Sequence, residues 1–188
     1  MPRRFIERIS RRNAHSQQYY DGFDYPENAE PYLISGFLAP AYLLYSAGID
    51  VIPSPFWAVY TSPLTGKTTI VSHDSLSNQN VFGVDSGQVM RHEFGAYVKF
   101  EFNKEVWENV TINTKLDLFS NYLENPQNID MNFNMLIAMK VNKYLTVNVS
   151  TEFIYDHDIK ILTDFETGHK GPRLQVKELL GVGLAFNF

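Results

Sequence analysis

Strict alternation of apolar and polar residues across residues 90–123 constrains the fold of this chain more than any other feature. From Met90 the even positions are almost all apolar, whereas the odd positions up to residue 103 carry four charges. A repeat of two residues is the period of a β-strand, whose successive side chains point to opposite faces of the sheet. After a short connection at residues 104–108, the alternation resumes at Val110. This region therefore predicts two paired strands, both longer than is usual in soluble domains.

The second half of the chain repeats this pattern. Residues 131–142 and 145–155 alternate in the same way, and the chain ends in a strand-like GVGLAFNF. Directly paired residues of two antiparallel strands share a face. Placing Val141 opposite Leu145 therefore predicts a three-residue turn at residues 142–144.

The first half is less regular. Residues 32–49 are almost continuously apolar, and we expect Pro40 within them to mark an edge, a bulge or a kink. Residues 50–55 read as a turn, and residues 63–66 (PLTG) read as a turn that interrupts the following strand. Residues 73–88, rich in Ser, Asn, Asp and Gly, read as a long polar loop.

The lengths of the predicted connections alternate. Short turns at 104–108 and 142–144 separate longer loops at 73–88, 124–130 and 156–172. Outer-membrane barrels have short turns on one side of the membrane and longer loops on the other. The sequence thus predicts an all-β, antiparallel up-and-down β-barrel of outer-membrane type. Residues 15–188 would form this single domain, after a basic N-terminal segment (1–14) that need not be ordered.

The strand count depends on the first predicted strand. Seven strands follow from residue 32 onward, and a strand at residues 15–25 would supply an eighth. We therefore expect either a barrel of about eight strands or the C-terminal part of a larger barrel.

Composition excludes several classes of function. The chain of 188 residues has no cysteine, which rules out disulfides, zinc–thiolate sites and thiol nucleophiles. A formal net charge of -5 leaves no basic stripe for binding nucleic acid. There is no apolar run of the length that a membrane-spanning helix needs, but barrel strands give only a weak hydropathy signal.

The candidate functional residues are the charged side chains that share one face of the predicted strands, which we call the charged parity. Charges inside a narrow barrel must be paired or hydrated. We expect either a ladder of salt bridges that fills a small lumen or the wall of a polar conduit. If the residue numbers of paired positions sum to 208, Arg91 faces Asp117 and Glu93 faces Lys115. The predicted lumen-lining residues are Arg91, Glu93, Lys99, Glu101, Lys115, Asp117, Lys140 and Glu152.

No catalytic, cofactor or metal site is predicted, and we expect the protein not to be an enzyme. Asp156, His157 and Asp158 could bind a divalent cation in a loop, but adjacent side chains of an extended chain point apart, which disfavours such a site. His92 lies on the apolar parity near a strand end, where placement at a membrane interface is the simpler interpretation.

Two alternatives remain open. A soluble or periplasmic barrel that binds an apolar ligand would also alternate, with its apolar face inside. A membrane-embedded hydrolase would use His92 and a serine. The aromatic residues near strand ends, such as Trp107 and Tyr155, favour membrane interfaces and therefore a bacterial outer-membrane location.

Several strings of this sequence together resemble an uncharacterised outer-membrane β-barrel-type family of the Bacteroidetes, a family of unknown function. They are FLAPAYL (37–43), SPLTGKTTIV (62–71), RHEFGA (91–96), NVTINTKLDLFSNYLENPQNIDMNF (109–133), MKVNKYLT (139–146), IYDHDI (154–159) and LQVKELLGVGLAF (174–186).

The resemblance begins at about Tyr20 and implies a porin-like fold without an assigned activity. It also implies outer-membrane lipid as surroundings. The last strand, which ends at Phe188, resembles the segment that the barrel assembly machinery recognises. The family carries a signal peptide and a β-rich portion upstream, so we expect strands outside this sequence if residues 15–25 do not close the barrel.

Overall fold

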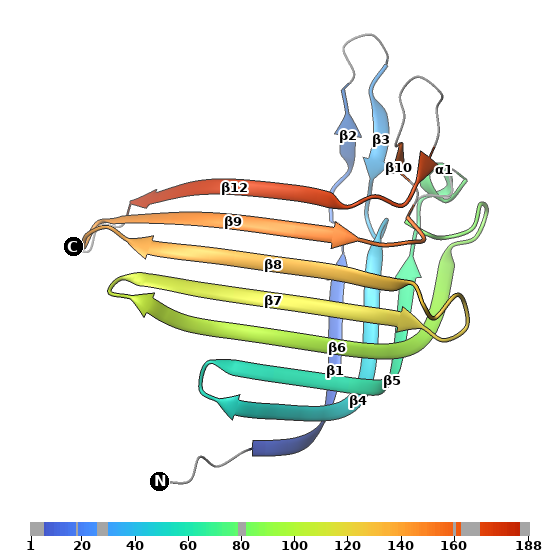
Figure 1. The fold of residues 1–188 in the computed structure, drawn as a ribbon. Coiled ribbons are helices and arrows are strands. Elements are labelled where there is room, and N and C mark those ends of the chain that lie inside the picture. The colour runs from blue at the N-terminus through green and yellow to red at the C-terminus, as the bar shows by residue number, and fades with distance from the viewer. Residues whose placement is uncertain are drawn as a thin grey trace.

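The computed structural model describes residues 6–17, 19–25, 30–78, 82–159, 161–162 and 170–184. In this part of the chain, eight strands form one antiparallel sheet in the order β1-β4-β5-β6-β7-β8-β9-β12 (Figure 1). The strands are β1 (Ile6–Gln17), β4 (Ala41–Ser54), β5 (Trp57–Ile70), β6 (Met90–Trp107), β7 (Val110–Asn121), β8 (Ile129–Lys140), β9 (Leu145–Tyr155) and β12 (Gln175–Leu184).

Sequential strands of the sheet are neighbours, and the long connections carry small additional elements. A hairpin of β2 (Gly22–Asp24) and β3 (Tyr32–Ser35) lies between β1 and β4, and β10 (Ile161–Leu162) pairs with β11 (Lys170–Gly171) between β9 and β12. A single helical turn, α1 (Asp74–Ser77), follows β5. The predicted all-β, antiparallel up-and-down architecture is confirmed. No helix in the described part of the chain is long and apolar enough to cross a membrane.

Short turns join the strands at one end of the sheet, and the long connections lie at the other (Figure 1). The short connections are residues 55–56, 108–109 and 141–144. We call the opposite end the long-loop end. The alternation of connection lengths predicted from the sequence is therefore confirmed.

Closure of the sheet into a barrel is not seen in the described residues. There, β1 pairs with β4 and β12 pairs with β9, so each keeps one free edge. The predicted strand at residues 15–25 is wrong, since β1 is Ile6–Gln17 and Gly22–Asp24 belongs to the separate hairpin. The pairing of β1 along β4 is long-range, and the basic composition of residues 1–14 does not indicate it. The final residues 185–188, with Phe188, lie outside the described residues.

The register of β6 and β7 differs from the predicted one. Lys99 pairs with Asp117 and Glu101 with Lys115, so partner numbers sum to 216 and not 208. The cause is a tighter turn: β6 continues to Trp107, and only Glu108 and Asn109 connect it to β7. Asn109 has a φ of 64°, a conformation that asparagine tolerates better than most residues. The predicted pairs Arg91–Asp117 and Glu93–Lys115 are therefore wrong.

The predicted turn between β8 and β9 is confirmed. The backbone N–H of Val141 donates to the carbonyl of Leu145 across 2.9 Å, and Lys140 pairs with Thr146.

Two predicted turns in the first half are instead parts of long strands. Residues 50–54 continue β4, and residues 63–66 lie within β5. Pro63 is accommodated at a bulge, where the pairing of β5 with β6 shifts between Ser62 and Thr65. Pro40 lies in the connection between β3 and β4.

A corner crosses three neighbouring strands at this bulge. In β4 a Cβ on Gly48 would lie 2.0 Å from the Thr61 carbonyl oxygen, and in β6 a Cβ on Gly95 would lie 1.9 Å from that of Ser120. Glycine is required at both positions because the backbones approach too closely for a side chain. Gly48 lies at the register shift between β4 and β5, and Gly95 pairs with Thr65 at the shift between β5 and β6. Figure 1 shows that β4 and β5 bend sharply along their length.

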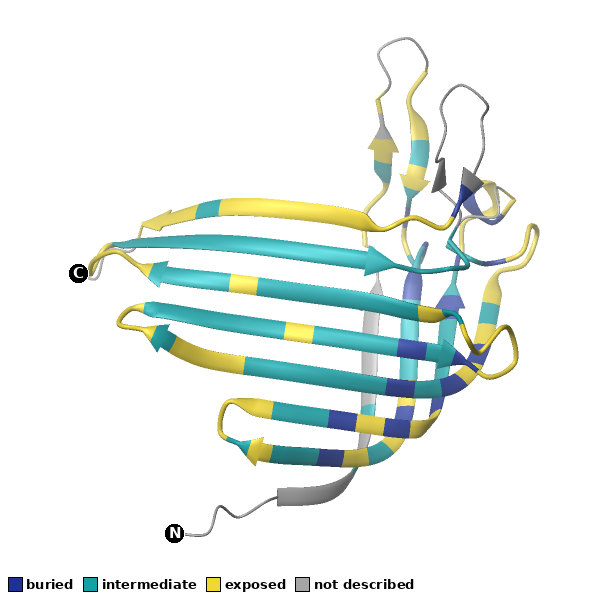
Figure 2. Ribbon diagram, in the orientation of Figure 1, coloured by how far each residue is buried: buried dark blue, intermediate teal, exposed yellow. Residues whose placement is uncertain are grey.

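The charged parity lines the concave face of the sheet. Lys67 Nζ on β5 lies 3.1 Å from Asp130 Oδ2 on β8, although strands three positions apart are about 14 Å apart in a flat sheet. The sheet must therefore curve around these side chains. Buried residues gather on β4 to β7, from the bends of β4 and β5 to the long-loop end (Figure 2).

Candidate functional site

A network of charges occupies the concave face at the long-loop end, and we call it the mouth network. Its members come from β5, β6, the start of β8 and the loops after β7 and β9. They are Lys67, Arg91, Glu93, Glu124, Asp130, Asp156 and Asp158.

Lys67 lies among three carboxylates. Its Nζ atom is 3.3 Å from Glu93 Oε2, 3.1 Å from Asp130 Oδ2 and 3.9 Å from Asp156 Oδ2. The ammonium group also lies 5.1 Å from the centre of the Phe119 ring, a cation–π distance. One lysine thus connects β5 to β6, to β8 and to the loop after β9.

Arg91 joins three of the long connections. Its guanidinium donates to the Gly83 carbonyl at 2.9 Å, to Glu124 Oε2 at 2.9 Å and to Asp158 Oδ2 at 2.6 Å. These acceptors belong to the connections after β5, β7 and β9, respectively. The planar guanidinium presents five N–H donors in a fixed geometry, which suits a bridge of this kind.

Glu93 links the two cations. Its side chain is 3% exposed, with Oε2 near Lys67 and Oε1 3.6 Å from Arg91 Nη2. The Oε1 atom is buried and makes no hydrogen bond. With two cations and five carboxylates, the network has a formal charge of −3 when all groups are ionised. A buried carboxylate without flanking cations would be costly, so Glu93 requires both Lys67 and Arg91.

An aromatic cluster and further ion pairs continue the concave face toward the short turns. Tyr60, Tyr97 and Phe119 form its buried centre, where the Tyr60 hydroxyl donates to Ser46 Oγ at 2.9 Å and the Tyr97 hydroxyl donates to Asp117.

The ion pairs around this cluster join both distant and neighbouring positions of the chain. Arg12 pairs with Asp50 and lies 4.0 Å from Glu101. The Arg12 guanidinium lies over the Tyr60 ring. Two further pairs are Lys99–Glu101 at 2.5 Å and Lys115–Asp117 at 2.8 Å.

Hollows along this face are lined by described residues of the sheet. One, of about 440 Å³, borders the mouth network and is lined by Tyr42, Lys67, Phe119, Asp130 and Asp156, among others.

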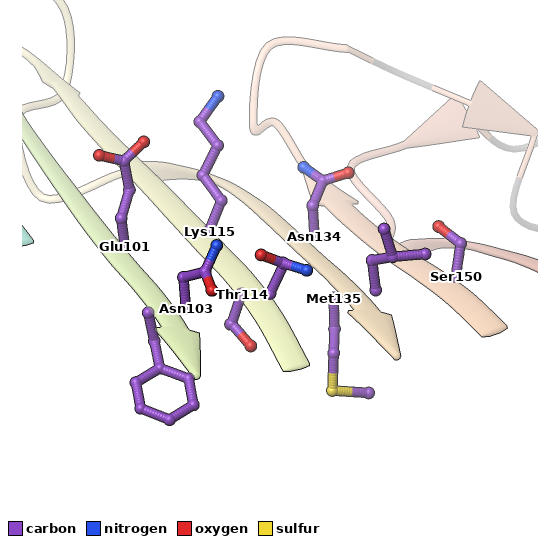
Figure 3. A pocket seen from close by; sticks show the side chains of 10 residues that line it. Glu101, Asn103, Thr114, Lys115, Asn134, Met135 and Ser150 are labelled. Atoms are coloured by element: carbon purple, nitrogen blue, oxygen red, sulfur yellow. The ribbon is translucent and has the colours of Figure 1, made fainter. Parts of the chain in front are cut away.

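Another hollow, of about 560 Å³, crosses β6 to β9 closer to the short turns. There Glu101, Lys115, Asn134 and Ser150 project to one side of the sheet, whereas Thr114 and Met135 project to the other (Figure 3).

The structure brings together six of the eight predicted lumen residues, in two groups. Arg91 and Glu93 belong to the mouth network, and Lys99, Glu101, Lys115 and Asp117 form a second group on the same face. Lys140 is exposed at the short-turn end of β8, and Glu152 on β9 pairs with Lys177 of β12 in the ladder.

Sequence reasoning missed Lys67, Asp130, Asp50 and Arg12. The bulge in β5 breaks the alternation that would have revealed Lys67, and Arg12 lay in a segment not predicted as a strand. Asp130 shares the even parity of Asn132 and Asn134, and that signal could have found it.

The residues considered for catalysis or cation binding do not form a common site. His92 projects from the face of β6 opposite to Glu93, and its Nδ1 atom lies 2.9 Å from Thr68 Oγ1. Asp156 and Asp158 pair with Lys67 and Arg91, respectively. Within the described ranges, no group of three or more His, Asp or Glu side chains is arranged to hold a metal ion.

Comparison with known proteins identifies no relative: no family model, no curated protein and no solved structure matches this chain. The site itself is the concave face of a curved antiparallel sheet, on which charged side chains are paired.

Replacing Arg91 with methionine should release the three connections that it joins. Hydrogen bonds between charged groups each contribute about 1.5–3 kcal/mol, and 1.4 kcal/mol is a factor of ten in an equilibrium. We expect amide hydrogen exchange to accelerate at least about tenfold around residues 83, 124 and 158. Mass spectrometry of exchanged peptides would measure this.

The matched control for this prediction is Lys104→Met, at the other end of the same strand, where the ammonium lies 4.9 Å from the centre of the Phe56 ring. It should leave exchange in these connections unchanged. Equal acceleration in both variants would show that Arg91 does not hold the connections together.

Proposed function

We propose that this chain is a non-enzymatic β-barrel protein of the bacterial outer membrane, or part of the wall of a larger barrel, with a structural or accessory role. The observation that carries the proposal is the polarity of the two faces. The concave face holds the ion pairs, and the convex face is nearly free of charge along neighbouring strands. A soluble sheet has the reverse arrangement, because it buries its apolar face.

The convex face suits contact with lipid. On β8 and β9 its members include Phe133, Ile137, Val147, Val149 and Phe153, which pair across the two strands as Phe133–Phe153 and Ile137–Val149. Transmembrane β-strands need about 9–11 residues, and β6 to β9 each have at least 11.

The mouth network favours a structural role over an open conduit. Its side chains cross the concave face from β5 to β8 and tie three connections together, which reduces the space available for a solute at that end. The free edges of β1 and β12 would have to be paired in lipid, because unsatisfied backbone groups are costly there.

The charges on the concave face disfavour the alternative function, a barrel that binds an apolar ligand inside. Such a ligand would have to displace or desolvate Lys67, Glu93 and Asp117, which line or adjoin the concave face. That cost argues against an apolar ligand in this position.

Detergent dependence tests the proposal. The full chain should remain monodisperse only with detergent or lipid, and the folded form should migrate differently on a gel before and after heating. In phospholipid vesicles, added protease should spare the strands. A monodisperse, folded monomer in detergent-free buffer would contradict the proposal.

A further inference from the structure

The β2–β3 hairpin exposes an unusual number of aromatic side chains. We call residues 19–25 and 30–38 the aromatic hairpin. It rises beyond the sheet at the long-loop end, and most of its described residues are exposed (Figures 1 and 2). Tyr20 is 84% exposed and Tyr25 is 72% exposed. The exposed large apolar and aromatic residues of this hairpin are Tyr19, Tyr20, Phe23, Tyr25, Tyr32, Ile34 and Phe37.

The base of the aromatic hairpin is fixed to the rest of the protein. Leu33 packs against a small buried core that includes Ala39, Val71 and Leu76. The backbone N–H of Ser72 donates to the Leu38 carbonyl at 3.0 Å, and the Ser72 hydroxyl donates to that of Phe37. Alternation along β3 then leaves Tyr32 and Ile34 exposed on the face opposite to Leu33. The β3 strand of the hairpin, with Tyr32, is therefore held against the rest of the protein, which lowers the entropic cost of binding a partner there.

The charge of this segment indicates the chemistry of the partner. Residues 19–38 contain four acidic residues, Asp21, Asp24, Glu27 and Glu30, and no Lys or Arg. An anionic lipid surface would be repelled, and two copies meeting through the same hairpin would bring acid against acid. A basic partner would find both carboxylates and aromatic faces, which bind the guanidinium of arginine especially well.

We propose that the aromatic hairpin is a docking site for an arginine-rich segment of another protein. Exposed tyrosines offer large, rigid contact surfaces at low entropic cost, and Tyr and Arg dominate the energetics of protein interfaces. The exposed Asp21 and Glu30 of the same hairpin accelerate the encounter and exclude acidic partners. This inference is independent of the membrane location proposed above.

Binding of a labelled peptide to the full chain in uncharged detergent tests the proposal. The probe is a short fluorescent peptide of alternating Arg and Gly, with an alternating Glu and Gly peptide for comparison, and fluorescence anisotropy is the readout. The Arg peptide should bind more tightly. The double variant Tyr20→Ala/Tyr25→Ala should weaken it about tenfold or more, whereas Tyr20→Phe/Tyr25→Phe should retain binding. The double variant Asp21→Asn/Glu30→Gln should weaken it and reduce its salt dependence.

Tyr144→Ala, at the short-turn end, is the matched control and should bind as the wild type does. Equal affinity for the Arg and Glu peptides, or unchanged binding by the tyrosine-to-alanine variant, would overturn the proposal. It would also be overturned if that variant lost only self-association in sedimentation, or only binding to vesicles that contain lipopolysaccharide. The first of these results would make the partner a second copy, and the second would make it a lipid surface. Unchanged gel migration would show that each variant still folds.

Discussion

Replacing Lys67 with methionine should cost about 3–5 kcal/mol of the free energy of unfolding, the range observed when one partner of a buried ion pair is removed. The Lys67 side chain is 18% exposed and lies within 4 Å of Glu93, Asp130 and Asp156. Methionine fills similar space but leaves three carboxylates facing one another without their shared cation. Urea titration followed by tryptophan fluorescence would measure the loss.

Lys115→Met is the matched control. Lys115 is also a concave-face lysine, but its side chain is 46% exposed and its ion pair is with Asp117. Exposed pairs contribute little, so this variant should lose less than about 1 kcal/mol. A double-mutant cycle with Asp130→Asn should show that the Lys67→Met cost is partly relieved when one carboxylate is removed. Equal losses for the two lysines would contradict the central role given to Lys67.

Placing arginine at Ile137 should cost about 2–4 kcal/mol in the free energy of folding into lipid vesicles, the range for a cation at the bilayer midplane of a barrel. Ile137 lies on the convex face between Ile112 and Val149 on the neighbouring strands, so a guanidinium there would have apolar neighbours on both sides.

Asn134→Arg tests the other face of the same strand. Asn134 pairs with Glu152 on β9 and with Lys115 on β7, so an arginine there has a carboxylate directly opposite. The loss should be well below that of Ile137→Arg. If both arginines cost the same, the assignment of the convex face to lipid is wrong.

Regular alternation made the second half of the fold predictable. The parity of β6 to β9 separates the two faces without knowledge of any distant contact, and the face shared by Val141 and Leu145 determined the turn between β8 and β9. Prediction failed where strand pairing or register depends on residues far apart in the sequence or on the conformation of a turn. The pairing of β1 with β4 joins residues as far apart in sequence as Ile6 and Ile52. The β6–β7 register depended on a turn that contains Asn109 at a positive φ.

For the candidate site, the sequence predicted only which face of the sheet carries the charges and not which charges pair. Parity placed Arg91, Glu93, Lys99 and Asp117 on one side of the sheet, but their actual partners depend on curvature. The mouth network joins strands that are three positions apart, and no pattern within a single strand encodes such a distance. The glycines that permit the corner are visible in the sequence, yet their alignment across β4, β5 and β6 requires the register.

The curvature of the sheet also determines when the Lys67–Asp130 ion pair of the mouth network can form during folding. Pairing of neighbouring strands alone would give a flat sheet in which Lys67 and Asp130 stand too far apart to meet. The Lys67–Asp130 ion pair therefore forms only after the sheet has curved, and strand pairing alone is not enough. An intermediate with every native backbone ladder but no such curvature would still place Lys67 opposite Glu93 on the neighbouring strand. It would lack the contact of Lys67 with Asp130, and its stability would be insensitive to replacement of Asp130.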